Sequence, residues 1–245
     1  MLERRGQGVE TPARFLMFGL SPQFLRFRLR LACGPRTLPG MFTGIVQAVG
    51  TVKGVQAQAP GLRIEVDPLG WGFQPGAGDS ISVDGCCLTI VDAAGSPERC
   101  WRFDAVPETL SKTTLRSWRV GTRVNLEHAA TAATFMGGHV VQGHVDGVGL
   151  ILDVRQGADW RVRVRPGDAL MEYMVPKGSV ALNGVSLTLA EVSPAEGWIE
   201  VALVPATLEK TNLAALRTGD GVNVEADSMA KTMIHWLKNY AAFKR

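Results

Sequence analysis

The chain has 245 residues, a net charge of +3, a hydrophobic fraction of 46% and a charged fraction of 20%. This composition is ordinary for a chain that folds around a sizeable core, and no apolar run approaches the roughly 20 residues of a membrane-spanning helix. The four cysteines lack the paired Cys-x-x-Cys spacing of zinc sites, and a disulfide framework is not indicated either. These features favour a reducing cytosol, so we expect a cytoplasmic protein with no metal and no membrane partner.

The first 40 residues differ in charge from the rest of the chain. They hold seven arginines and two glutamates, a net charge of +5, so the remaining residues carry −2. A basic surface for nucleic acid therefore has no support outside this leader. The leader could be a targeting peptide, an amphipathic arm, or an extension before a start at Met41. We favour the third interpretation and expect residues 1–40 to be a disordered or dispensable extension.

From Met41 onward the chain repeats itself at a nearly constant offset. The stretch "DGCCLTI" (84–90) matches "NGVSLTL" (183–189) at an offset of 99, and "TLSKTTL" (109–115) matches "TLEKTNL" (207–213) at an offset of 98. Solenoids and propellers repeat at much shorter periods, so a period near a hundred residues predicts two domains in tandem.

Within each half, short alternating segments rich in Val, Ile and Thr are separated by Gly, Pro, Asp and Asn. This pattern predicts an all-β fold, with one compact barrel or sandwich of about six strands at 41–137 and another at 138–226. The one clear helix, at 227–245, carries an apolar stripe that needs a partner and predicts an oligomer. Its members are Met229, Met233, Ile234, Leu237, Tyr240 and Ala241.

The repeated strand puts small polar groups on one face. Residues two apart on a strand share a face, so Cys87 and Thr89 should point outward while Cys86, Leu88 and Ile90 face the interior. The equivalent outward residues of the second copy are Ser186 and Thr188. Such groups on the outer face of a barrel are usually only solvated, so function needs further signals.

The junction "MGGHVVQGH" contains His139 and His144. It could be a plain glycine-rich linker. A metal site is disfavoured, because the two histidines lack helical i,i+4 spacing and have no acidic third ligand nearby. A histidine beside glycines, which let a ligand approach the backbone, is more consistent with hydrogen bonding or acid–base chemistry.

Seven motifs in order resemble the riboflavin synthase α-chain family: "MFTGIV", "GCCLT", "ETL", "GGHVVQGHVDG", "KG", "NGVSLT" and "VNVEAD". The resemblance covers 41–245 and none of 1–40. It implies two six-stranded Greek-key barrels and a C-terminal helix that build a homotrimer, with active sites between subunits. It also implies association with lumazine synthase and no cofactor.

The activity that the resemblance implies is the dismutation of two 6,7-dimethyl-8-ribityllumazine molecules. One donates a four-carbon unit to the other, giving riboflavin and 5-amino-6-ribitylamino-uracil. An alternative is a non-catalytic lumazine- or flavin-binding antenna protein of the same fold. A flavin-dependent oxidoreductase is less consistent with the sequence, because no GxGxxG unit is present.

The resemblance also implies substrate-binding residues in two pockets. The first set is Gly44, Ile45, Val46, Cys87, Leu88, Thr89, Asp104, Ala105, Val106, Pro107, Glu108, Thr109, Gly143, His144 and Val145. The second set is Lys177, Ser186, Leu187, Thr188, Leu203, Val204, Pro205, Ala206, Thr207 and Leu208.

Four residues are expected to take part in the chemistry. His144 would transfer a proton or orient a ligand, and Cys87 and Ser186 would stabilise or deliver a nucleophile at a ring carbon. Asp227 would hold charge or a proton nearby, although its position also suits the N-cap of the final helix. Lys177, in the second binding set, could equally be an ordinary surface lysine.

Three positions depart from the family pattern. Asp84 stands where asparagine is usual, and His128 stands where Arg or Lys is common. Ala206 stands where the second barrel usually has Glu, which removes a carboxylate able to bind ribityl hydroxyls.

Overall fold

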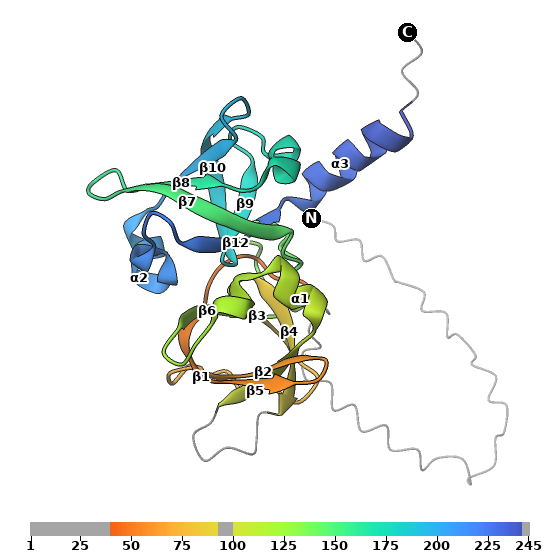
Figure 1. Cartoon of the computed structure of the whole chain (residues 1–245), viewed down its shortest axis with the longest axis vertical. Helices are drawn as coiled ribbons and strands as arrows, with labels where there is room; N and C mark the ends of the chain where they lie inside the picture. Colours follow the sequence, from red (N-terminus) through yellow and green to blue (C-terminus); the bar gives the residue numbers. More distant parts are fainter. Residues whose placement is uncertain (1–39, 93–99, 242–245) are drawn as a thin grey trace, which may run out of the picture. The chain divides into compact units, whose positions relative to one another are not determined.

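The computed structural model describes residues 40–92 and 100–241. Most of these residues form two closed barrels, each of six antiparallel strands (Figure 1). The prediction of an all-β tandem fold is confirmed. The expected extension at 1–40 lies outside the described residues apart from Gly40.

The first barrel has the strand order β1-β2-β5-β4-β3-β6, with a short helix and a 3-10 turn between β5 and β6. Pro107 begins the helix, where its missing N–H group costs nothing. The elements are β1 (Ala48–Gln58), β2 (Gly61–Asp67), β3 (Ser80–Val83), β4 (Cys86–Asp92), β5 (Trp101–Ala105), α1 (Pro107–Lys112), η2 (Thr114–Ser117) and β6 (Arg123–His128).

The second barrel repeats this plan with the order β10-β11-β8-β7-β12-β9. It adds a 3-10 segment, η3, before β9, and a longer helix, α3, follows its last strand. The elements are β7 (Gly147–Arg155), β8 (Arg161–Arg165), η3 (Asp168–Tyr173), β9 (Ser179–Leu182), β10 (Val185–Ser193), β11 (Trp198–Ala202), α2 (Pro205–Lys210), η4 (Asn212–Ala215), β12 (Gly221–Ala226) and α3 (Ser228–Asn239).

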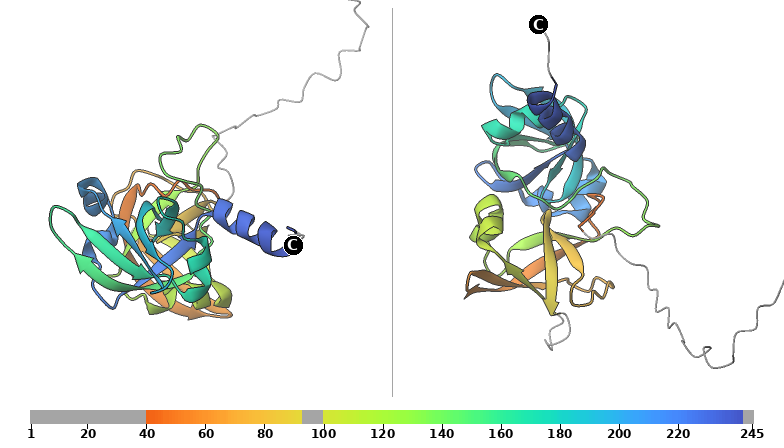
Figure 2. Two further views of the ribbon diagram at one scale, coloured as in Figure 1. Left: turned by 90° about the horizontal axis from the view of Figure 1, so that it is seen from above. Right: turned by 90° about the vertical axis from the view of Figure 1, so that its right-hand side faces the viewer.

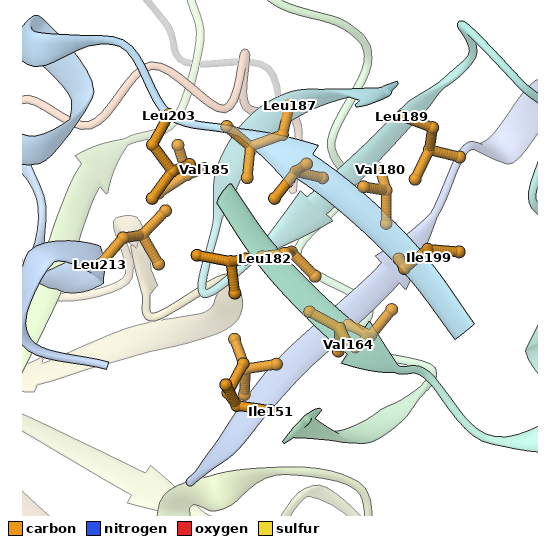
Figure 3. Packing of buried hydrophobic residues seen from close by; sticks show 14 of the residues in the cluster. Ile151, Val164, Val180, Leu182, Val185, Leu187, Leu189, Ile199, Leu203 and Leu213 are labelled. Carbon is orange, nitrogen blue, oxygen red and sulfur yellow. The ribbon is translucent and has the colours of Figure 1, made fainter. Parts of the chain in front are cut away.

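Each barrel is filled by the inward-facing residues of its own strands. In β4, Cys86, Leu88 and Ile90 are buried while Thr89 is exposed and Cys87 is half-buried, which confirms the predicted faces. The core of the second barrel is built mainly from branched aliphatic side chains (Figure 3). Each fully buried side chain of this size contributes about 1.5–3 kcal/mol, so these cores account for the stability of the barrels.

The two barrels meet through their equivalent hairpin turns. Gly85 and Gly184 have φ angles of +78° and +76°, and a Cβ atom on Gly85 would lie 2.6 Å from the backbone nitrogen of Gly184. Only glycine tolerates both that conformation and that approach. The turn residues before them, Asp84 and Asn183, are buried.

Two asparagines tie these turns together across the interface. The side-chain amide of Asn125 donates to the carbonyl oxygen of Asn183 at 2.9 Å, and that of Asn223 donates to the carbonyl oxygen of Asp84 at 2.8 Å. Asn125 and Asn223 are themselves equivalent in the repeat, at an offset of 98. The contact between the barrels therefore has approximate twofold symmetry.

Helix α3 is held to the second barrel on one side only, and it stands clear of the strands (Figure 2). Lys231 pairs with Asp146 at 3.0 Å, and Lys238 pairs with Glu172 of η3. The opposite face is apolar and exposed: Met229, Met233, Trp236, Leu237 and Tyr240. Among the described residues, no helix has the length and apolarity to cross a membrane.

Candidate functional site

Cys87 and Ser186 occupy equivalent positions in the two barrels. Each is the second residue of a strand, β4 or β10, that follows one of the two hairpin turns at the interface between the barrels. Each lies on the outer face and is half-buried. The backbone N–H of Cys87 donates to the carbonyl oxygen of Gly143 at 2.9 Å, and that of Ser186 donates to the carbonyl oxygen of Gly44 at 2.8 Å. The start of β4 in the first barrel is therefore covered by the segment that leads into the second barrel. The start of β10 in the second barrel is covered by the segment that leads into the first barrel.

Two buried glutamates hold these crossing segments. The carboxylate of Glu127, in β6, accepts from the amides of Thr43 at 2.7 Å and Gly44 at 3.0 Å. The carboxylate of Glu225, in β12, accepts from the amide of Gly143 at 2.9 Å and from the residue before it at 2.7 Å. Burial raises the pKa of both carboxyls, while these amides lower it. Each glutamate thus positions a segment that contacts the other barrel.

The sequence analysis assigned Gly44, Ile45 and Val46 to the first pocket, but the segment that contains them crosses to the second barrel. The structure places Gly44 against Ser186, and Val46 packs on the core of the second barrel. The equivalent Val145 packs on the core of the first. The segment before β1 crosses to the second barrel, a long-range arrangement that the order of motifs does not encode.

A cavity of about 270 Å³ lies beside Cys87. It combines the outer face of β4, helix α1 and the crossing segment before β7. Its lining residues are Cys86, Cys87, Glu108, Thr109, Lys112, Thr113, Gly143, His144 and Val145. Six of these nine were expected for the first pocket. We call this cavity the first site.

The cysteines of the first site are thiols rather than thiolates at neutral pH. Burial raises the pKa of Cys86 to about 12, and the neighbouring Cys87 adds to this shift. Burial also raises the pKa of Cys87, although a hydrogen bond with Ser80 opposes the shift. A thiol can donate a hydrogen bond but is a weak nucleophile, so Cys87 suits ligand positioning better than covalent attack.

Around Ser186 the structure brings in one of the two junction histidines, which the sequence had assigned to neither pocket. His139 Nδ1 lies 2.7 Å from Ser186 Oγ. The approach depends on Gly138, because a Cβ atom there would lie 2.8 Å from the same oxygen. We call Ser186, His139 and the covering Gly44 the second site. The two-histidine motif signalled His139, but the choice between it and His144 needed the fold.

The charge state of His139 follows from its surroundings. Burial lowers its pKa, and the charge of Asp227 opposes the shift. Its Nε2 atom is buried without a hydrogen-bond partner among the described residues. A neutral imidazole at pH 7 can accept the hydroxyl proton of Ser186. Asp227 also caps α3, since its carboxylate accepts from the amide of Met229 at 2.8 Å, so its N-cap role is present.

Other expected residues of the first set lie beside the first site but do not line it. Asp104 is exposed and pairs with Arg63 at 2.8 Å, which lowers the pKa of its carboxyl. Ala105 belongs to the core, and Val106 is the N-cap of α1, which Pro107 begins. Leu88 and Thr89 follow Cys87 along β4, one inward and the other outward.

The second set is distributed in the same manner. Leu187 and Leu203 belong to the core, and Leu208 packs against it. Thr188 is exposed, as is Lys177, whose backbone N–H donates to the carbonyl oxygen of Leu189. The remaining members form the N-terminal end of α2: Val204, Pro205, Ala206 and Thr207.

A second cavity, of about 630 Å³, lies between strand β1 and helix α2. Of the predicted site residues it includes only Val46. Its lining residues are Val46, Gln47, Ala48, Val49, Leu69, Arg123, Glu209 and Lys210. No group of three or more His, Cys, Asp or Glu residues within 40–92 and 100–241 could hold a metal ion.

The lumazine-binding domain model matches the chain twice, at residues 43–129 and 142–227. Riboflavin synthase of Mycobacterium tuberculosis is 40% identical over 193 residues, which cover 78% of this chain and 95% of that protein. The chain belongs to the riboflavin synthase family.

Other members of the riboflavin synthase family show similar agreement. The protein of Schizosaccharomyces pombe is 38% identical over 194 residues, covering 78% of this chain and 91% of its own. A solved structure, LumP complexed with riboflavin, superposes with a TM-score of 0.68 at 29% identity and covers 76% of this chain and 98% of that one. LumP complexed with 6,7-dimethyl-8-(1'-D-ribityl) lumazine gives a TM-score of 0.66 at 28% identity over the same shares.

Proposed function

We propose that the protein is a riboflavin synthase. It converts two molecules of 6,7-dimethyl-8-ribityllumazine into riboflavin and 5-amino-6-ribitylamino-uracil by transfer of a four-carbon unit. The observation that carries the proposal is the duplicated arrangement at Cys87 and Ser186, where two equivalent strands are each covered by a crossing segment. Two molecules of one substrate require two similar binding sites. Because one molecule donates the four-carbon unit and the other accepts it, the side chains of the two sites are expected to differ.

The chemistry needs proton removal from the C7 methyl group of one lumazine and nucleophilic addition to a ring carbon of the other. Holding both molecules together supplies much of the rate enhancement by proximity. In the first site, His144 and the Cys87 thiol line the cavity and would contact a bound ring, while Glu108 and Thr109 would offer acceptors and a hydroxyl to the ribityl chain.

In the second site, neutral His139 accepts the proton of the Ser186 hydroxyl and raises its nucleophilicity. Asp227 places negative charge near the imidazole and favours its cationic form once the proton has arrived. This arrangement would let Ser186 add to, or deliver water to, a ring carbon. His139 therefore joins His144, Cys87, Ser186 and Asp227 as a proposed catalytic residue.

We further propose a cytoplasmic homotrimer in which the sites of neighbouring subunits face one another, and an association with lumazine synthase. The exposed apolar face of α3 supports assembly, because burial of Trp236 and Tyr240 against a second copy of the chain would lower the free energy of the system. The leader at 1–40 is proposed to be dispensable, with barrels at 41–137 and 138–226 and the assembly helix at 227–245.

The deciding experiment is incubation of the full chain with 6,7-dimethyl-8-ribityllumazine alone, with riboflavin followed by its absorbance. Formation of riboflavin and the pyrimidine product in equal amounts supports the proposal. Binding of the lumazine without turnover would instead support the antenna alternative, which the likeness to LumP makes concrete. The matched control is Ser186→Ala, which should bind the lumazine and turn it over slowly.

A further inference from the structure

The two sites differ systematically in their titratable groups. The repeat relates Cys87 to Ser186 and His144 to Ile45 at an offset of 99. It relates Glu108 to Ala206 at an offset of 98. Thus the thiol, the imidazole and the carboxylate of the first site are replaced at the equivalent positions by groups that do not ionise, and the imidazole of the second site, His139, comes from a different position.

Glu108 is the replacement with the clearest consequence for binding. It lines the first site from helix α1, next to Thr109. Its carboxylate can accept hydrogen bonds from two neighbouring hydroxyls of a polyol, and hydrogen bonds to a charged acceptor are roughly twice as strong as neutral ones. The methyl group of Ala206, at the equivalent place in α2, can accept none.

Among the described residues, no other carboxylate of helix α2 takes the place of Glu108 in the second site. Helix α2 does carry a carboxylate one turn later, at Glu209, but that residue lines the separate cavity with Arg123 and Lys210. The hydroxyl of Ser186 already has a partner in His139. The lysines of the two helices, Lys112 and Lys210, are equivalent in the repeat, but Lys112 lines the first site whereas Lys210 lines the separate cavity.

We infer that the two sites bind a ribityl-bearing ligand with unequal affinity, that the first site is the tighter, and that the Glu108/Ala206 difference sets the gap. The inference rests on the proposed function, which supplies the class of ligand. It makes Ala206 the residue that keeps the second site weak.

Riboflavin is the probe, because as the proposed product it is not consumed. Calorimetric titration of the full chain should resolve two affinities per chain that differ by about tenfold or more. Glu108→Gln should weaken the tighter site by about tenfold, and Ala206→Glu should strengthen the weaker site by a similar factor. Ala206→Gln is the matched control for side-chain size, and it should leave the weaker affinity within about twofold.

Alkylation of Cys87, followed by peptide mapping, assigns the sites. Because Cys87 lines the first site, riboflavin should protect it at concentrations that fill only the tighter site. Protection that appears only with the weaker phase would overturn the assignment.

Two equal affinities, or an Ala206→Glu variant with an unchanged weaker site, would overturn the inference while riboflavin formation from the lumazine still upheld the proposed function. A Glu209→Ala variant that weakens the second site would also overturn it, by showing that the carboxylate has moved one turn rather than disappeared. A chain that neither binds riboflavin nor turns over the lumazine would overturn the proposed function itself.

Discussion

The side-chain amide of Asn212 donates a 2.9 Å hydrogen bond to Oδ1 of Asp84. The bond crosses between the barrels and reaches a carboxyl group that is 3% exposed. In the repeat, Asp84 is equivalent to Asn183 and Asn212 to Thr114, so both partners differ from their counterparts. Asp84, which departs from the family pattern, therefore has a side-chain amide donor in Asn212. The residue equivalent to Asn212 in the first barrel, Thr114, has no side-chain amide.

This contact predicts a pH-dependent stability. Burial raises the pKa of Asp84 to about 7, above its ordinary value of 3.8, so the folded protein binds a proton more readily than the unfolded chain. Stability should therefore fall as pH rises from about 4 to 7. Asp84→Asn keeps the acceptor oxygen and removes the charge. It should raise the free energy of unfolding by up to about 4 kcal/mol at pH 8, with no difference below pH 4.

Urea unfolding at a series of pH values measures this difference, with exposed Asp153→Asn as the control. A variant that is less stable than the parent at pH 8 would contradict the prediction.

The His139–Ser186 contact predicts a pH limb in turnover. Because burial lowers the pKa of His139, the imidazole is neutral at pH 7 and loses its ability to accept a proton from Ser186 only in more acidic solution. The kcat should fall on acidification below the ordinary histidine range. In His139→Gln, kcat should drop by about 10²-fold or more and that limb should disappear. His235→Gln on α3 is the control, and an unchanged acidic limb in His139→Gln would contradict the assignment.

The glutamates that hold the crossing segments predict crossed effects. Glu225→Gln replaces an oxygen that accepts from a backbone amide with an NH₂ group, which should cost about 1–3 kcal/mol of stability. Although Glu225 belongs to the second barrel, its change should weaken riboflavin binding at the first site. Glu127→Gln should weaken the second site instead. Calorimetry with exposed Glu191→Gln as control tests both, and each variant acting on its own barrel would be the contrary result.

Gly143 predicts a strong dependence on the absence of a side chain. Its φ angle is +74°, and a Cβ atom would lie 2.6 Å from Cβ of Cys87. Gly143→Ala should therefore cost well over the roughly 1–2 kcal/mol of the backbone strain alone. Gly121→Ala provides the control, because its φ is +92° but its Cβ would meet nothing within 4 Å. Equal losses of unfolding free energy for the two variants would show that the chain relieves the clash with Cys87 at no cost.

The exposed face of α3 predicts an assembly that one charge can weaken. Trp236 is 55% exposed in the single chain. Trp236→Glu should shift sedimentation from the proposed trimer towards monomer and make turnover depend on protein concentration. Val120→Glu, at a side chain 66% exposed on the first barrel, is the control. A Trp236→Glu variant that stays trimeric would place the subunit contact elsewhere.

Much of this architecture is encoded locally. The alternation at Cys86–Ile90 predicts which side chains enter the barrel, and the constant offset of the repeat predicts two barrels rather than one. Helical spacing likewise predicts four of the five exposed apolar residues of α3, but it missed Trp236. Family resemblance added the composition of the first site, including Glu108 and His144.

What the sequence did not provide depends on contacts between distant residues. The positions of Gly44 and Gly143 follow from hydrogen bonds across more than 40 residues, which no local pattern specifies. For the same reason the sequence could not choose His139 as the partner of Ser186. The buried glutamates were visible only as repeated letters, because a carboxylate that binds backbone amides has no signature of its own.

The crossing of the two lead-in segments bears on how such chains can be recombined. A chimera that joins residues 41–137 of this protein to the second half of a relative would import Gly143, His144 and Val145 from the relative. One wall of the first site would then come from the relative. In the second site, Gly44 of this protein would cover the relative's counterpart of Ser186. Neither parental site would survive intact, so halves exchanged at the glycine-rich junction must be compatible at both places at once.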